Sequence, residues 1–146
     1  SEIITSMQEG YKITVILIDN NGFASIGGLS KSIGSEGFGT KYQFRDQKTG
    51  YLEGERLPVD LAMNAESLGA KVYKATNIAS FNEALKNAKK EEKTTVIYIE
   101  TVPERKMAGY GYAWWDVPIA AVSESESVQK AFENYSEQKK KQRWFL

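Results

Sequence analysis

The sequence predicts an α/β domain built as three layers, with a parallel sheet flanked by helices. Three observations predict it. Strongly β-branched runs occur at Lys12–Asp19, Lys71–Thr76 and Thr94–Val102, and segments with helical spacing and capping residues lie around them. At 146 residues, with 41% hydrophobic and 26% charged residues, the chain has the size and apolar content of one soluble domain. Strands that alternate with helices imply right-handed crossovers and a parallel sheet.

The first segment predicts a short helix that leads directly into a strand. Ile3, Ile4 and Met7 follow helical spacing, and Gly10 ends the helix. The near-continuous apolar run that follows, up to Asp19, predicts a strand buried on both faces. A helix at residue 1 that enters a core strand favours a piece of a larger protein over a domain that starts with a short helix.

The segment Gly27–Pro58 differs from its surroundings. It contains seven of the twelve glycines, interleaved with aromatic residues, and it lacks strong periodicity. A connection of about 30 residues is long for a compact domain, and such loops are usually functional or disordered.

Regular patterns return after Pro58. Asp60 caps a predicted helix that ends at Gly69, and Ser80 with Glu83 forms a capping-box pattern for the next helix. The aromatic, glycine-rich segment Met107–Val117 follows the third strand; its pair Trp114–Trp115 is predicted to lie in a core or interface. A last helix is predicted from one apolar face, made of Val128, Ala131, Phe132 and Tyr135, and the basic run of residues 139–143 is interpreted as its solvated end.

Composition excludes several classes of function. The chain has no cysteine and no histidine, which excludes disulfides, thiolate zinc sites and a Ser-His-Asp triad. Nineteen basic residues balance nineteen acidic ones, so nothing predicts nucleic acid or an anionic membrane as partner. No run approaches the ~20 apolar residues of a membrane span, and a cytoplasmic location is the default expectation. Catalysis is left to carboxylates, backbone groups, a cofactor or a hard metal ion.

The segment from Ile18 to Phe23 is where chemistry is expected, because ligands bind at the carboxyl ends of strands in open α/β sheets. Asn20 offers an amide oxygen, and Gly22 permits a turn that aims its carbonyl at the same point. Oxygen donors of this kind suit magnesium. The alternative is an ordinary Asx turn, which the six residues taken alone favour.

The run Asp-Asn-Asn-Gly-Phe at residues 19–23 resembles the second half of the thiamine-diphosphate-binding motif of acetolactate-synthase-like enzymes. In that branch the pattern is Asn-Asn-x-Gly-Tyr/Phe, with Asp tolerated at the first position. The resemblance implies that Asn20 and Gly22 bind Mg²⁺ and that Asn21 is the variable position. It further implies cofactor contacts by Phe23 and Ala24 beside the diphosphate, and by Ser25 and Ile26 near the reactive ring or the substrate.

The resemblance covers nearly the whole chain. The segments that are similar to helices and to the last sheet strand of these enzymes are Pro58–Ala62, Ala65–Ala70, Ser80–Leu85 and Thr95–Ile99. Other segments resemble the trihydroxycyclohexane-dione hydrolases of inositol catabolism: Glu9–Lys12, Gly27–Tyr51, Gly109–Val117, Ala120–Ser123 and Ser127–Gln129. The resemblance implies an enzyme that uses thiamine diphosphate and Mg²⁺ to cleave a carbon–carbon bond next to a carbonyl, opening the ring of a cyclic polyhydroxy dione.

Two parts of such an enzyme are missing from this sequence. It contains no Gly-Asp-Gly, whose aspartate would be a third protein ligand to magnesium, and no pyrimidine-binding domain with its activating glutamate. We therefore expect residues 1–122 to be an incomplete C-terminal cofactor-binding domain and residues 123–146 a helical extension. The expected partners are the pyrimidine-binding domain, a small-molecule substrate and further copies in a homo-oligomer.

The resemblance leaves two questions open, the role of the glycine-rich segment and the function of the parent protein, for which there are three possibilities. The glycine-rich segment Gly27–Gly54 is either a lid or subunit contact that orders with the cofactor, or a static surface loop. The parent is either the ring-opening hydrolase or another enzyme with the same cofactor, such as an acetolactate synthase or a 2-oxoacid decarboxylase. A non-catalytic α/β binding or assembly module is the third possibility, which the missing Gly-Asp-Gly favours for this chain in isolation.

Overall fold

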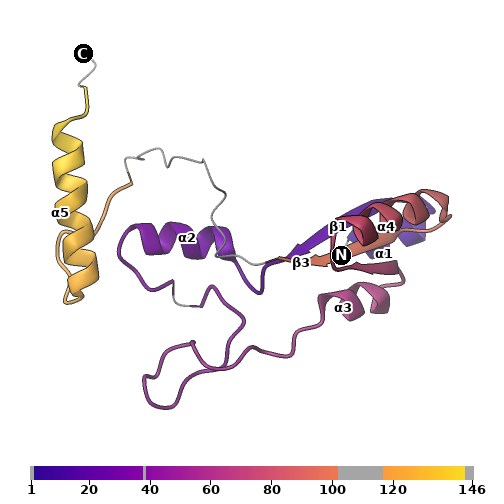
Figure 1. Ribbon diagram of the computed structural model, residues 1–146, viewed down its shortest axis with the longest axis horizontal. Coiled ribbons are helices and arrows are strands. Elements are labelled where there is room, and N and C mark those ends of the chain that lie inside the picture. The colour runs from indigo at the N-terminus through magenta and orange to yellow at the C-terminus, as the bar shows by residue number, and fades with distance from the viewer. Residues whose placement is uncertain (1, 38, 102–116, 144–146) are drawn as a thin grey trace. The chain divides into compact units, whose positions relative to one another are not determined.

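The computed structural model describes residues 2–37, 39–101 and 117–143, and the chain divides into two compact units (Figure 1). The first unit is Ser1–Asn21 with Leu57–Pro103, and it contains the sheet. The second unit is Gly22–Arg56 with Glu104–Leu146. The predicted role of Trp114 and Trp115 falls outside the described residues.

Three parallel strands form the sheet of the first unit, in the order β1-β3-β2. Their bounds are Thr14–Asp19 for β1, Lys71–Ala75 for β2 and Thr95–Glu100 for β3. In this register Thr14 lies opposite Thr95, and Asp19 lies opposite Glu100. The central strand β3 carries the most deeply buried apolar residues, Val96 and Ile97. The prediction of a parallel sheet from three β-branched runs is therefore confirmed.

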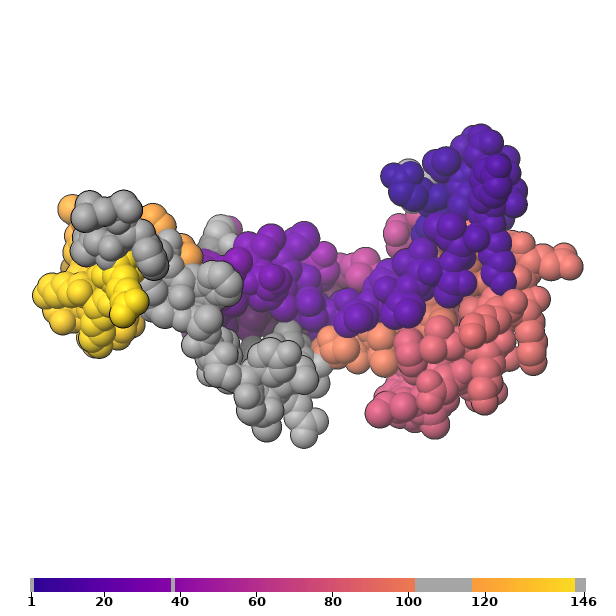
Figure 2. All heavy atoms as spheres, turned by 90° about the horizontal axis from the view of Figure 1, so that it is seen from above, coloured from indigo at the N-terminus to yellow at the C-terminus, as the bar shows by residue number. Residues whose placement is uncertain are grey.

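Helices cover both faces of this sheet. On one face, α4 (Ile78–Lys90) packs Ala84 and Ala88 against Ile97. On the other face, α1 (Glu2–Glu9) and α3 (Leu61–Ser67) contribute Ile3 and Ala65 to a cluster around Val96. Because successive side chains of a strand point to opposite faces, adjacent residues of β3 support two separate cores. In the space-filling view the N-terminal segment, in indigo, lies at the surface of this unit (Figure 2). The three-layer α/β prediction is confirmed.

The helix starts follow from capping chemistry. The Asp60 carboxylate accepts a 2.8 Å hydrogen bond from the Met63 amide, so Asp60 caps α3 as predicted. The cap of α4 is Asn77, whose side chain accepts from the Ser80 amide at 2.9 Å while the Ser80 hydroxyl accepts from the Asn77 amide at 3.1 Å. The prediction that Ser80 begins this helix is wrong by one turn, because Asn is as good an N-cap as Ser and lies three residues earlier.

The second unit contains a helix that the sequence did not predict. Helix α2 spans Ala24–Ser32, and its later residues fall within the segment predicted to be an irregular loop from Gly27 onward. Two adjacent glycines lower helix propensity, but Gly27 is buried where a side chain would lie 2.6 Å from the Thr40 hydroxyl. The last helix, α5 (Glu126–Lys140), appears as predicted, and the four residues of its predicted apolar face are half-buried.

One strand face is only partly covered. Helix α4 contacts β2 and β3. On the same face of the sheet, β1 presents Ile16 and Ile18, which are 47% and 62% exposed. Within the described residues β1 is an edge strand, so the prediction of a first strand buried on both faces is wrong, and the core of the first unit is centred on β3.

The packing predicts that two isoleucines on one face of the sheet contribute very differently to the free energy of unfolding. Ile97→Ala should lower the free energy of unfolding by about 2–5 kcal/mol, because Ile97 is fully buried and leaves a cavity. Ile18→Ala is the matched control and should change it by about 0.5 kcal/mol or less, because Ile18 is exposed. Urea unfolding followed by circular dichroism measures both. Equal losses would mean that the core is not centred on β3.

Candidate functional site

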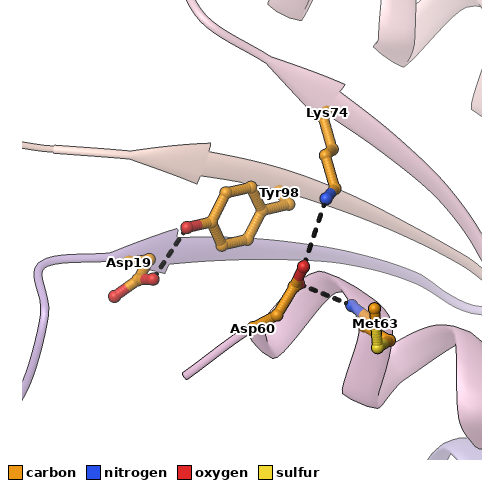
Figure 3. A network of polar contacts seen from close by, with 5 residues as sticks. All are labelled: Asp19, Asp60, Met63, Lys74 and Tyr98. Carbon is orange, nitrogen blue, oxygen red and sulfur yellow. Dashed lines mark hydrogen bonds and ion pairs between the residues drawn. The ribbon is translucent and has the colours of Figure 1, made fainter. Parts of the chain in front are cut away.

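The end of β1 is fixed by a buried aspartate. Asp19 is only 4% exposed, and its carboxylate accepts a hydrogen bond from the Tyr98 hydroxyl at 2.8 Å (Figure 3). It also accepts one from the Asn21 amide at 2.8 Å. Its backbone carbonyl accepts from the Thr101 amide at 2.8 Å and from the Thr101 hydroxyl at 3.3 Å. Side chain and backbone of Asp19 are therefore both held by groups at the carboxyl end of the sheet.

The two residues that follow Asp19 present oxygens with no partner among the described residues. The side chain of Asn20 is half-buried and makes no hydrogen bond within that part of the chain. Asn21 has a positive φ of 62°, and its side-chain nitrogen donates to Glu100 at 3.3 Å. The Oδ1 atom of Asn21 is buried, and no described group donates to it. Buried oxygens without a donor are unfavourable, so they are candidates for binding an external donor or cation.

Gly22 opens the second unit, because the boundary between the units falls after Asn21. It forms an isolated antiparallel bridge with Lys41, and the next amide, that of Phe23, donates to the Thr40 carbonyl at 2.7 Å. A side chain at Gly22 would lie 2.2 Å from that carbonyl, so only glycine fits. No described group donates to the carbonyl of Gly22 itself.

The predicted cofactor contacts after Gly22 form the start of α2. Phe23 is its N-cap, and Ala24, Ser25 and Ile26 make its first turn. The amides of a first turn lack intrahelical acceptors, and here no described group outside the helix accepts from those three. The Phe23 ring packs edge-on against Tyr42, with ring centroids 5.8 Å apart. Free amides together with the helix dipole make this terminus favourable for an anion such as a phosphate.

A charged pair lies on the sheet face that carries Tyr98. Lys74 sits opposite Tyr98 in the register, and its ammonium is 3.5 Å from the Asp60 carboxylate (Figure 3). The Met63 amide and, to a smaller extent, Lys74 hold the pKa of Asp60 below its ordinary value. Asp60 therefore stays ionised at neutral pH and serves α3 as a cap.

The second unit also contains a small polar cavity of about 190 Å³. Its lining residues all belong to the segment Gly27–Gly54, which includes the later part of α2 and for which a lid or subunit contact and a static loop were both left open. Two cations and two carboxylates face it, Lys31, Lys41, Glu36 and Glu53. This mixture of charges suits a small polar molecule better than an apolar one.

The donor set decides which metal would fit. Within the described ranges, no group of three or more Asp, Glu, His or Cys residues could hold a metal ion. The oxygens at hand are the Asn20 amide and the Gly22 carbonyl, which are hard ligands of the kind that magnesium accepts beside water and phosphate oxygens. The chemistry of each of these oxygens is compatible with Mg²⁺ that takes its other ligands from water and phosphate.

Residues 1–99 match the family of the thiamine pyrophosphate enzymes at its C-terminal TPP binding domain. Because the match covers more than half of the chain, the chain belongs to this family. The family assignment agrees with the motif at residues 19–23 and with the α/β fold.

Individual relatives carry a more specific name. Over 134 residues, the chain is 42% identical to 3D-(3,5/4)-trihydroxycyclohexane-1,2-dione hydrolase 2 of Bacillus cereus. It is 43% identical to a 3D-(3,5/4)-trihydroxycyclohexane-1,2-dione hydrolase of Clostridium botulinum, and 41% identical to that of Bacillus anthracis. Each alignment covers 92% of this chain, and the chain spans about a fifth (21%) of each relative's length.

Two further findings concern solved structures and membrane helices. No solved structure matches the chain. Among the described residues, no helix has the length and apolar character required to cross a membrane.

Sequence reasoning missed the residues that hold the site from outside the motif. Tyr98 and Thr101 fix Asp19 from the neighbouring strand and the residue after it, and Thr40 lies against Gly22. The only signal for Tyr98 is a polar hydroxyl near the end of an apolar strand, and its partner becomes apparent only from the strand register.

The close approach at Gly22 predicts a steep cost for a single methyl group. Gly22→Ala should lower the free energy of unfolding by at least about 2 kcal/mol, because the new carbon overlaps the Thr40 carbonyl and the φ of 151° is strained for other residues. Gly28→Ala is the matched control inside α2; its methyl group meets open space, and it should stabilise by about 0.5–1 kcal/mol. Urea unfolding of both variants measures the contrast. A neutral Gly22→Ala would contradict the contact with Thr40.

Proposed function

We propose that this chain is the C-terminal cofactor-binding part of an enzyme that uses thiamine diphosphate and Mg²⁺ to open the ring of a trihydroxycyclohexane-1,2-dione by carbon–carbon cleavage. The names of the relatives at 41–43% identity support this substrate. The observation that carries the cofactor assignment is that neither the Asn20 side chain nor the Gly22 carbonyl has a hydrogen-bond partner in the described chain, whereas Asp19 is hydrogen-bonded through both its carboxylate and its carbonyl.

In this proposal Asn20 binds the metal through its side-chain oxygen and Gly22 through its backbone carbonyl. Asp19 and the side-chain nitrogen of Asn21 hold the loop, since Asp19 accepts from Tyr98 and that nitrogen donates to Glu100. The buried Oδ1 of Asn21 has no described donor, and the motif assigns it no metal contact. Magnesium prefers about six hard ligands and keeps substrate phosphates among them. Two protein oxygens, the cofactor's diphosphate and water are consistent with that preference.

The diphosphate lies at the start of α2 in this proposal, beside Phe23 and Ala24. The free amides of the first turn support it, because anions are stabilised there. Ser25 and Ile26 extend from the same turn toward the reactive ring or the substrate. When bound, thiamine diphosphate supplies the carbanion-stabilising chemistry that cleavage next to a carbonyl requires. The chain's own contribution is to bind and orient the cofactor's charged end.

The remaining parts of the site come from outside this chain. A chain that spans 21% of its relatives leaves room for the Gly-Asp-Gly aspartate and for the pyrimidine-binding domain with its glutamate. We further propose that the parent is a cytoplasmic homo-oligomer of inositol catabolism, and that the segment Gly27–Gly54 acts as a lid or subunit contact. The glycines and interleaved aromatic residues of that segment support this role.

Assays of the full-length enzyme test the substrate. The cyclic dione should be consumed in a reaction that needs both thiamine diphosphate and Mg²⁺. Turnover of pyruvate in place of the dione would instead support an acetolactate synthase or 2-oxoacid decarboxylase. Turnover of neither, with no cofactor binding, would support a non-catalytic module.

The isolated 146-residue chain should bind thiamine diphosphate weakly or not at all, with a dissociation constant well above the micromolar range. Magnesium releases its water reluctantly and requires near-octahedral geometry, which two protein oxygens leave underdetermined. Titration calorimetry in the presence of Mg²⁺ measures this constant. Micromolar or tighter binding would mean that the chain holds more of the site than we propose.

Asn20→Ala in the full-length enzyme should lower activity at limiting magnesium by about 100-fold, because a misplaced cofactor costs roughly that factor. Added magnesium should restore part of the loss, since water replaces the missing oxygen and the metal still binds. Steady-state kinetics across a magnesium titration measure both effects, with folding checked by circular dichroism.

The matched control for this variant is Asn21→Gly. Glycine adopts a φ of 62° without strain, so the loop keeps its conformation although the bond from the Asn21 side chain to Glu100 is lost, and the motif treats this position as variable. It should cost much less activity than Asn20→Ala. The opposite order would shift the metal assignment by one residue, and two near-normal variants would leave residues 19–23 as a simple turn.

A further inference from the structure

Tyr98 connects the centre of the sheet to the loop that follows β1. It lies on β3 opposite Leu17, and its hydroxyl donates to the carboxylate of Asp19, two residues further along β1 (Figure 3). Side chains two residues apart on a strand share a face, so this diagonal contact requires no distortion of the sheet. The proposed ligand Asn20 is the residue directly after Asp19.

The Asp19 carboxylate uses each of its oxygens for a different task. One accepts from Tyr98, and the other accepts from the backbone amide of Asn21. A buried carboxylate requires donors for both oxygens, so the two contacts fix its orientation together. Rotation of the side chain away from Tyr98 would also break the bond to Asn21.

The bond to the Asn21 amide matters because that residue has a left-handed backbone conformation. Its φ of 62° is uncommon for a residue other than glycine; asparagine tolerates it better than most, and contacts around it help to hold it. Asp19 supplies one such contact, and the Asn21 side chain supplies a second through Glu100. The backbone on both sides of Asn20 is thereby held, by Asp19 before it and by Asn21 after it.

We infer that Tyr98 is a positioning residue for the metal-binding loop and acts through Asp19 to hold the backbone that presents Asn20. The inference rests on the function proposed above for the identity of the metal. The part of the inference that does not depend on the metal is that the Tyr98 hydroxyl restrains the loop. This part can be tested without metal or cofactor.

The test compares two tyrosines on neighbouring strands. Tyr98→Phe removes only the hydroxyl that reaches Asp19. Tyr73→Phe is the matched control, because the Tyr73 hydroxyl also donates to a carboxylate, that of Glu91, which lies just after α4 and before β3 begins. A third variant, Asp19→Asn, keeps an oxygen for the Asn21 amide and offers its NH₂ group to the Tyr98 oxygen, so both contacts are retained.

The first measurement is hydrogen exchange of the Asn21 amide, by NMR on this chain without metal. Tyr98→Phe should speed that exchange about 10-fold relative to the core amide of Ala88, while Tyr73→Phe and Asp19→Asn should leave the ratio within about twofold of wild type. If Tyr73→Phe speeds the exchange as much as Tyr98→Phe, a general loss of stability explains the effect and the inference is overturned. If Asp19→Asn speeds it as much, the loss of charge explains the effect, and the inference is overturned as well.

The second measurement is the magnesium concentration for half-maximal thiamine diphosphate binding by the full-length enzyme. Tyr98→Phe should raise this magnesium concentration about 10-fold, which is the lower end of the loss in metal affinity caused by removing groups that orient metal ligands without touching the metal. At saturating magnesium, cofactor binding should approach that of the wild type. No rise beyond that of Tyr73→Phe would overturn the positioning role. A wild-type enzyme that shows no magnesium-dependent binding would overturn the proposed function instead, and the exchange experiment would still decide whether Tyr98 restrains the loop.

Discussion

The parallel pairing of β1 with β3 brings the groups described above to Asp19 and Asn21. In this register Asp19 ends opposite Glu100, which brings Tyr98 to the Asp19 carboxylate, Thr101 to its carbonyl and Glu100 to the Asn21 side chain. A slip of one residue would turn each side chain to the other face of the sheet. The hydrophobic packing of Val96 and Ile97 against helices on opposite faces holds the register, so the core and the polar loop depend on the same pairing.

Most of the fold follows from local patterns. The three strands are short β-branched runs, and Asp60 has the residue type and spacing of an N-cap, so both could be predicted from the sequence. Helix α2 could not, because Phe23 provides no side-chain cap and Gly27 and Gly28 lower the helix propensity. This helix is supported instead by a tertiary contact, the close fit of Gly27 against Thr40. The start of α4 was predicted one turn too late, because two good capping residues, Asn77 and Ser80, occur one turn apart.

In the candidate site, too, some residues could be predicted from the sequence and others could not. Asn20 and Gly22 could be proposed from the sequence because a family motif names their positions, and the family is confirmed over residues 1–99. Nothing local indicates that Tyr98 serves this loop, since Tyr98 and Asp19 are 79 positions apart in the chain. The metal roles of Asn20 and Gly22 and the cofactor contacts of Phe23 to Ile26 stay predictions. What the structure adds is a physical reason to propose them, namely oxygens and amides without partners within the described residues.

The exposed isoleucines of β1 have a consequence for handling the protein. Within the described residues β1 is an edge strand, and six consecutive residues, Thr14–Asp19, combine high β propensity with a single charge. Edge strands of this composition offer unpaired backbone groups and an apolar face to other chains. Concentrated solutions of the 146-residue chain are therefore expected to self-associate through β1. A lysine in place of Ile16 or Ile18 would act as a gatekeeper against that association without disturbing the core around β3.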